Sequence, residues 1–148
     1  MPELELLSEK RPTDFKVEVF SGKEGLATVL RIILREKKDY LVFGEEGQFE
    51  KNFPILLKQV LRDAVAAGIH ERVLSKESKR GKITVTRNTQ IKYLPDEYFS
   101  PVATAIFGDK TALFNWNDPC NAVLIKSKGL AQSYKSYFEA LWKNSAKN

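Results

Sequence analysis

Side chains that could carry chemistry are few in this sequence of 148 residues. His70 is the single imidazole that could act as a general acid, a general base or a nucleophile. Since no second histidine accompanies it, an ordinary histidine at the rim of a strand is the favoured interpretation. The single cysteine, Cys120, excludes an internal disulfide and is expected to be a small buried residue. One histidine and one cysteine cannot form the usual zinc clusters, and we expect no metal and no cofactor.

The positive charge of the chain is concentrated between Ile69 and Lys92. This segment holds seven basic and two acidic residues, which accounts for the whole net charge of +5. Binding to nucleic acid requires several cations presented together, but Ser, Thr and Glu interleave with these cations, so a solvated charged loop over Ser75–Lys82 is favoured. Arg72 and Arg87 lie in or near predicted strands and are candidates for contacts to an anion or a pocket.

Three polar segments follow predicted strands. Gly22-Lys-Glu-Gly25 and Gly44-Glu-Glu-Gly47 lack the spacing of a dinucleotide or P-loop motif, and turn chemistry is their favoured interpretation. The cluster Asn115–Pro119 fits either a polar and aromatic pocket lining or a turn with Trp116 packed inward. Since open α/β sheets bind ligands at the carboxyl ends of their strands, we predict a ligand site there. Its residues are Ser21, Gly22, Gly44, Glu45, Asn115 and Trp116.

The periodicity of apolar residues predicts the elements that would position these side chains. Strands at 15–20, 40–43 and 69–74 alternate with helices at 24–38 and from 54 onward, an order typical of parallel strands joined by crossovers. Further strands are predicted at 83–86, 90–93, 102–107, 112–116 and 122–126, with a final helix at about 128–144. The predicted fold class is α/β, with a mixed, partly parallel sheet flanked by helices.

The last predicted helix carries an aromatic stripe. Tyr134, Tyr137 and Trp142 lie on it and suit a self-complementary face, so we predict a homodimer. Residues 1–14 are interpreted as a lead-in or the remnant of a linker helix, and residues 15–148 as one domain. No apolar run reaches the roughly 18 residues of a membrane span, so no membrane partner is expected. A reducing cytoplasm is the expected setting.

Three segments together resemble a known family. "FKVEVFSGKEGL", "IFGDKTALFNW" and "LAQSYKSYFEALWK" look like the effector domain of TrmB-type archaeal transcriptional regulators, over roughly Phe15–Lys143. That domain is similar in fold to half of the phospholipase D superfamily. The resemblance implies a domain that senses a small-molecule effector and relays it to DNA. It also implies that DNA is contacted only through a separate winged-helix domain, because the fourteen residues before Phe15 cannot form one.

The phospholipase D motif H-x-K-x-x-x-x-D gives a residue-level test of this resemblance. If Asp109 matches the aspartate, Val102 and Thr104 stand where the histidine and lysine are expected. In the G-S-x-x-N segment that follows, Cys120 replaces the asparagine. Without the nucleophile and its cation we expect a non-catalytic effector domain and no enzyme. Two alternatives stay open: a phosphodiester hydrolase that uses His70, and a module that binds nucleic acid directly.

Overall fold

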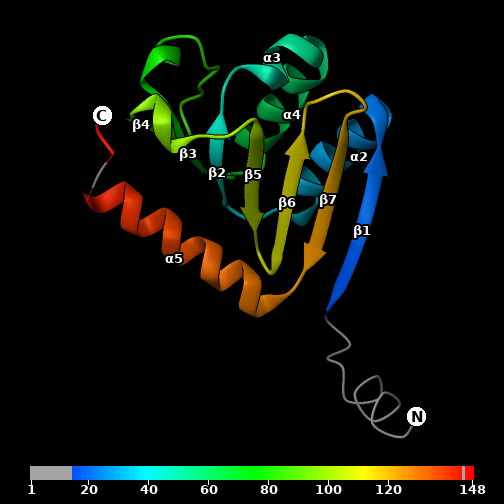
Figure 1. Cartoon of the computed structure of the whole chain (residues 1–148). Coiled ribbons are helices and arrows are strands. Elements are labelled where there is room, and N and C mark those ends of the chain that lie inside the picture. The colour runs from blue at the N-terminus through cyan, green and yellow to red at the C-terminus, as the bar shows by residue number, and fades with distance from the viewer. Residues whose placement is uncertain (1–14, 145) are drawn as a thin grey trace, which may run out of the picture.

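The computed structural model describes residues 15–144 and 146–148, so the predictions for residues 1–14 lie outside the described part (Figure 1). The described residues form a seven-stranded sheet in the order β1-β7-β6-β5-β2-β3-β4. The strands are β1 (Lys16–Ser21), β2 (Tyr40–Glu45), β3 (Glu71–Lys76), β4 (Thr89–Leu94), β5 (Val102–Phe107), β6 (Lys110–Asn115) and β7 (Asn121–Lys126). The helices are α2 (Gly22–Glu36), α3 (Gln48–Asn52), α4 (Pro54–Ala66) and α5 (Lys128–Asn144).

The sheet is mixed, as the sequence predicts. Strands β2, β3 and β4 pair in parallel, whereas β5, β6, β7 and β1 continue the sheet from β2 in antiparallel pairs. The strand–helix–strand order suggested that β1 lies beside β2. In the structure β1 forms one edge of the sheet, and β7, β6 and β5 lie between it and β2. The chain therefore crosses the sheet in α2 before it enters β2.

Helices cover the two faces of the sheet unequally. Helices α2, α3 and α4 lie on one face, and α5 crosses the other face on the side of β2, β5 and β6 (Figure 1). The main core lies under α2 and α4 and contains Leu26, Val29, Val42, Phe107 and Phe114. Gly25 lets α2 start against β1, since a Cβ there would stand 2.6 Å from the Phe20 carbonyl carbon.

The predicted strand at 83–86 is not formed. Side chains take up the backbone donors of this segment, because the Thr84 N–H donates to Glu50 Oε2 and the Thr86 N–H to Thr89 Oγ1. The segment is therefore a turn-rich connection in which side chains replace ladder partners. The loop predicted at 75–82 begins later than expected, since β3 runs to Lys76 and a 3₁₀ turn follows at Glu77–Lys79.

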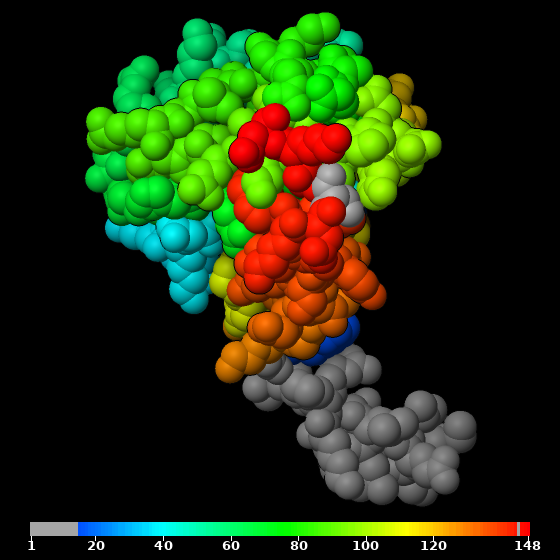
Figure 2. All heavy atoms as spheres, turned by 90° about the vertical axis from the view of Figure 1, so that its left-hand side faces the viewer, coloured from blue at the N-terminus to red at the C-terminus, as the bar shows by residue number. Residues whose placement is uncertain are grey.

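The strand ends define two ends of the molecule. The upper end of Figure 1 holds the carboxyl ends of β1, β2 and β6, and the lower end holds the first residues of β2, β3 and β4. Beyond β4, the N–H and C=O of Tyr93 bond to the backbone of Lys147, so C-terminal residues line that edge (Figure 2). Among the described helices, none has the length and apolar character that crossing a bilayer requires.

Candidate functional site

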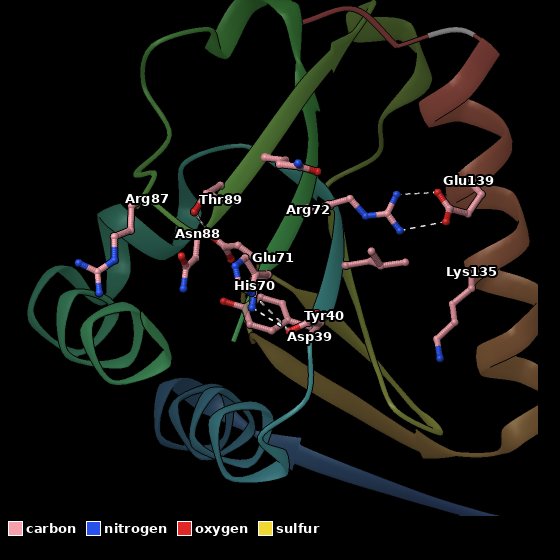
Figure 3. Close-up of a pocket in the computed structure, with 12 residues that line it drawn as sticks. Asp39, Tyr40, His70, Glu71, Arg72, Arg87, Asn88, Thr89, Lys135 and Glu139 are labelled. Atoms are coloured by element: carbon pink, nitrogen blue, oxygen red, sulfur yellow. Dashed lines mark hydrogen bonds and ion pairs between the residues drawn. The ribbon is translucent and has the colours of Figure 1, made fainter. Parts of the chain in front are cut away.

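A polar pocket of about 460 Å³ opens at the lower end, where three parallel strands begin beside α5 (Figure 3). The parallel register places Tyr40 beside Glu71 and Glu71 beside Thr89, so the residues just before these strands also come together. The lining residues are Asp39, Tyr40, Leu41, His70, Glu71, Arg72, Arg87, Asn88, Thr89, Gln90, Lys135 and Glu139. The pocket thus combines the lone histidine with both arginines that the sequence analysis singled out.

His70 lies at the mouth of the polar pocket, one residue before β3. Its backbone N–H donates to Asp39 Oδ1 at 2.8 Å, and its Nδ1 lies 4.0 Å from the same carboxylate oxygen. Both side chains are more than half exposed. This contact is longer than a hydrogen bond, but it places an anionic group beside the imidazole. The imidazole is therefore open to solvent with a carboxylate close by.

Arg72 is held firmly on the α5 side of the polar pocket. Its two terminal nitrogens donate to the two carboxylate oxygens of Glu139 at 2.6 and 2.9 Å, as Figure 3 shows. The guanidinium also lies over the rings of Phe138 and Trp142, with distances of 5.3 and 5.4 Å to their centroids. The hydrogen bond to Glu139 raises the pKa of Arg72, and Arg72 lowers the pKa of Glu139.

Two further cations flank the polar pocket. Lys135 of α5 donates its ammonium to the Gly108 carbonyl at 2.9 Å, which leaves donor capacity on the same group. Arg87 extends from the connection before β4 on the opposite side (Figure 3). Among the described residues Arg87 has no ion-pair partner within 4.0 Å. Arg87 is therefore the cation of this pocket best able to meet an anion from solution.

The floor of the polar pocket leads to a buried carboxylate cluster. Glu71 accepts a hydrogen bond from Thr89 Oγ1 at 2.7 Å, and Tyr40 and Glu71 also line a small pocket of about 60 Å³ together with Glu45. Burial raises the pKa of Glu71, and burial with the nearby Glu71 carboxylate raises that of the Tyr40 phenol. Burial and the nearby Glu50 carboxylate raise the pKa of Glu45 to about 8.

The six residues predicted to bind a ligand all lie at the upper end. Ser21 and Asn115 flank Asn121 in the sheet, and Gly44 approaches β5 so closely that a Cβ there would lie 3.0 Å from the Val102 carbonyl oxygen. The Glu45 carboxylate turns back to accept the Gly47 N–H at 2.7 Å. The six residues therefore share one end of the sheet, but β7, β6 and β5 separate Ser21 from Gly44, so the set does not form one cluster. Their role in ligand binding stays a prediction.

Trp116 packs inward, the second of the two alternatives that the sequence left open. Its ring lies 5.0 Å from Phe49, 6.3 Å from Phe53 and 6.1 Å from Phe114, measured between centroids. Phe49 belongs to α3, which begins directly after Gly47. We call these four side chains the aromatic cluster. It fills the space beneath α3 at the upper end.

The predicted dimer residues on α5 have different surroundings. Tyr134 and Tyr137 line an apolar groove of about 210 Å³ with Phe43, Ile106 and other residues, and Tyr137 is 69% exposed. Trp142 instead stacks on Phe138 and lies under the Lys92 ammonium. Two of the three predicted residues therefore share one groove, and the third packs within the α5–sheet contact.

The basic segment does not form one continuous surface. Lys76 pairs with Glu46 at 2.6 Å and Arg80 with Glu77 at 2.8 Å, while the Lys92 ammonium donates to the Trp142 carbonyl. Of the seven basic residues in this segment, Arg72 and Arg87 are the two that line the polar pocket. The local excess of charge is therefore divided between internal pairs and the pocket.

Comparison with known proteins places the fold. No protein-family model matches the sequence, and no curated protein matches it. Among solved structures, the archaeal chromatin protein TrmBL2, whose structure shows a novel mode of DNA binding, matches with a TM-score of 0.66 at 15% identity. The match covers 99% of this chain and 60% of that chain.

Two further solved structures are similar. Nuc from Salmonella typhimurium, a phospholipase D family member, matches with a TM-score of 0.63 at 15% identity, over 90% of this chain and 97% of that chain. Phosphatidylserine synthase from Haemophilus influenzae matches with a TM-score of 0.62 at 12% identity, over 93% of this chain and 40% of that chain. These matches confirm the predicted phospholipase D-like fold.

The expectation that this chain is not an enzyme is contradicted by these comparisons. The similar structures include a phospholipase D family member and a phosphatidylserine synthase, so this fold is also found in enzymes. The expectation was based on Val102 and Thr104 replacing the motif histidine and lysine. His70, which the alternative of a phosphodiester hydrolase would use, lines the polar pocket.

Proposed function

We propose that this chain is the ligand-binding module of a TrmB-like DNA-binding regulator, and that a small anionic molecule binds in the polar pocket. The observation that carries the proposal is that His70, Arg72, Arg87 and Lys135 all line one opening of about 460 Å³. A volume of this size is typical of small-molecule sites. The likeness to TrmBL2 supports the regulatory setting, in which DNA would be contacted by a segment outside this domain.

The roles of the pocket residues follow from their existing partners. Arg72 is already neutralised by Glu139 and is best suited to hold a fixed geometry. Arg87 and Lys135, on opposite sides, would supply the charge that attracts the ligand. Asp39 and Glu139 would favour a ligand that also carries hydroxyl or amino donors, since a carboxylate accepts hydrogen bonds. A sugar phosphate or a nucleotide has this combination of groups.

A thermal-shift screen of the full chain against sugar phosphates, nucleotides and carboxylic acids tests the proposal. A ligand that binds only the folded state raises the unfolding midpoint with its concentration. We expect Arg87→Gln to abolish that rise and the matched charge change Lys23→Gln, on exposed α2 surface, to preserve it. A ligand whose effect survives Arg87→Gln, or a panel without any effect, would contradict a site in this pocket.

Phosphodiester hydrolysis in the same pocket is the second candidate, favoured by the His70–Asp39 pair and by the similar phospholipase D family structure. The His70 imidazole would attack phosphorus as the bond to the leaving alcohol or phenol oxygen breaks, with Asp39 close to the imidazole and Arg87 stabilising the charge on the phosphate oxygens. Water would then cleave the phosphorus–nitrogen bond, which releases the phosphomonoester and restores His70. Turnover of bis(4-nitrophenyl) phosphate that His70→Ala reduces by about 100-fold or more would support it. A rate equal to the uncatalysed background in the unmodified protein would eliminate it.

A further inference from the structure

Strand β1 leaves an open edge at one side of the sheet. Its inner side pairs with β7, and no described residue pairs with its outer side. The opposite edge differs, because Lys147 bonds to both backbone groups of Tyr93 in β4. An open edge is a template for pairing with another strand unless the sequence protects it. Residues 15–21 contain neither proline nor glycine that would interrupt such pairing.

The hydrogen-bond pattern shows which residues of β1 face outward. Gly22 lies opposite Cys120 in the continued β1–β7 register, and its N–H donates to the Cys120 carbonyl at 2.9 Å. In an antiparallel pair, alternate residues point both backbone groups toward the partner or away from it. Val17 and Val19, at odd positions, therefore point their N–H and C=O groups away from β7.

The side chains of this strand alternate in character. Phe15, Val17 and Val19 are 49%, 51% and 66% exposed on the sheet face that α5 leaves open at this edge. Lys16 and Glu18 lie together on the other face, 3.5 Å apart. From Phe15 to Val19 the side chains are apolar, positive, apolar, negative and apolar. If a second copy of the strand runs antiparallel with its Val17 opposite Val17, each charged side chain lies opposite one of the other sign.

We propose that β1 pairs with β1 of a second copy of this chain, antiparallel and with Val17 on the two-fold axis. Lys16 then lies opposite the partner's Glu18, and Phe15 opposite the partner's Val19. Opposite charges directly across an antiparallel pair stabilise it, and like charges destabilise it. A shift of two residues one way sets Glu18 against Glu18, and the other way sets Lys16 against Lys16. Charge therefore selects one register.

The pairing would join two seven-stranded sheets into one continuous sheet. It would satisfy the outward backbone groups of Val17 and cover the exposed valines on the open face. This interface is distinct from the groove of Tyr134 and Tyr137 on α5. It also leaves the polar pocket, at the opposite side of the sheet beside β3 and β4, accessible to its ligand.

Charge exchange tests the proposal on the full chain by sedimentation over a concentration series. We expect a dimer whose dissociation constant rises about tenfold or more in Lys16→Glu, which opposes two glutamates, and in Glu18→Lys, which opposes two lysines. The double variant K16E/E18K should restore dimerisation, and so should a mixture of the two single variants. Lys23→Glu, the same charge change on exposed α2 surface, should leave the dimer unchanged.

Circular dichroism melts establish that the variants fold, which is expected because neither side chain is buried: Lys16 is 66% and Glu18 45% exposed. A strict monomer at high concentration would overturn the proposal. Dimers unaffected by either single variant, or single-variant defects that K16E/E18K fails to rescue, would overturn it too. A dimer lost only in Tyr137→Ser would assign the interface to α5 instead.

Discussion

The upper and lower ends of the molecule differ in the kinds of side chain that they contain. At the upper end, the aromatic cluster of Phe49, Phe53, Phe114 and Trp116 fills the space beneath α3, and Glu45 is only 7% exposed. At the lower end, strand starts and α5 leave an opening lined by charged side chains. The upper end is therefore packed for stability, and the lower end retains polar groups that a ligand can reach. Substitutions at the two ends should separate stability from binding.

The largest effect is expected from Phe114→Ala in the aromatic cluster. Phe114 is fully buried and contacts Phe49 edge to face at 5.0 Å between centroids. Its truncation removes that contact and leaves a cavity, which should lower the free energy of unfolding by about 3–5 kcal/mol. Urea denaturation measures the change.

The matched substitution at the lower end is Gln90→Ala. Gln90 is exposed and lines the polar pocket, so its loss should change the free energy of unfolding by less than about 0.5 kcal/mol. Equal losses of stability in Phe114→Ala and Gln90→Ala would remove the distinction between the two ends.

Titration of Glu45 should be the next largest effect. Its folded pKa of about 8 lies above the unfolded value near 4.5, so the folded state holds the proton more tightly. Stability from this group is fully present below pH 4.5 and is lost as pH rises to 8. Glu45→Gln keeps an oxygen for the Gly47 N–H and cannot ionise. At pH 8 it should unfold with a higher free energy than wild type, by a few kcal/mol. Urea titrations at pH 5 and pH 8 measure this, and parallel pH profiles would contradict it.

The elements were predictable where one pattern spans a whole segment. The final helix was predicted at about 128–144 and observed at Lys128–Asn144, because its stripe of apolar residues at helical spacing continues over four turns. The strand predicted at 83–86 failed because Thr84 and Thr86 bond to side chains of Glu50 and Thr89, partners that local periodicity does not show.

The polar pocket was only partly foreseeable. Arg72 and Arg87 were singled out because each lies beside a strand, but their approach to Lys135 depends on α5 returning across the sheet. That return is a tertiary contact over more than forty residues. Open α/β sheets bind ligands at the carboxyl ends of their strands, and this generalisation favours a site at the upper end. There, Phe49 of the short helix α3 packs against Trp116. The four residues of the aromatic cluster are visible in the sequence, but their spacing does not show that their side chains contact one another.

Of the two pH-dependent variants, Glu139→Gln should have the smaller effect, and its pH dependence should have the opposite sign to that of Glu45→Gln. Arg72 lowers the pKa of Glu139, so the pair stabilises the protein above the unfolded carboxyl pKa. That contribution is lost as pH falls through the lower folded pKa. Because the Glu139 side chain is 39% exposed, solvent screening limits the loss at pH 7 to about 0.5–1 kcal/mol. Urea titrations of both variants from pH 3 to pH 8 give the two signs in one experiment. If the loss of unfolding free energy in Glu139→Gln instead grows as the pH falls, the contact of Glu139 with Arg72 is not what stabilises the lower end.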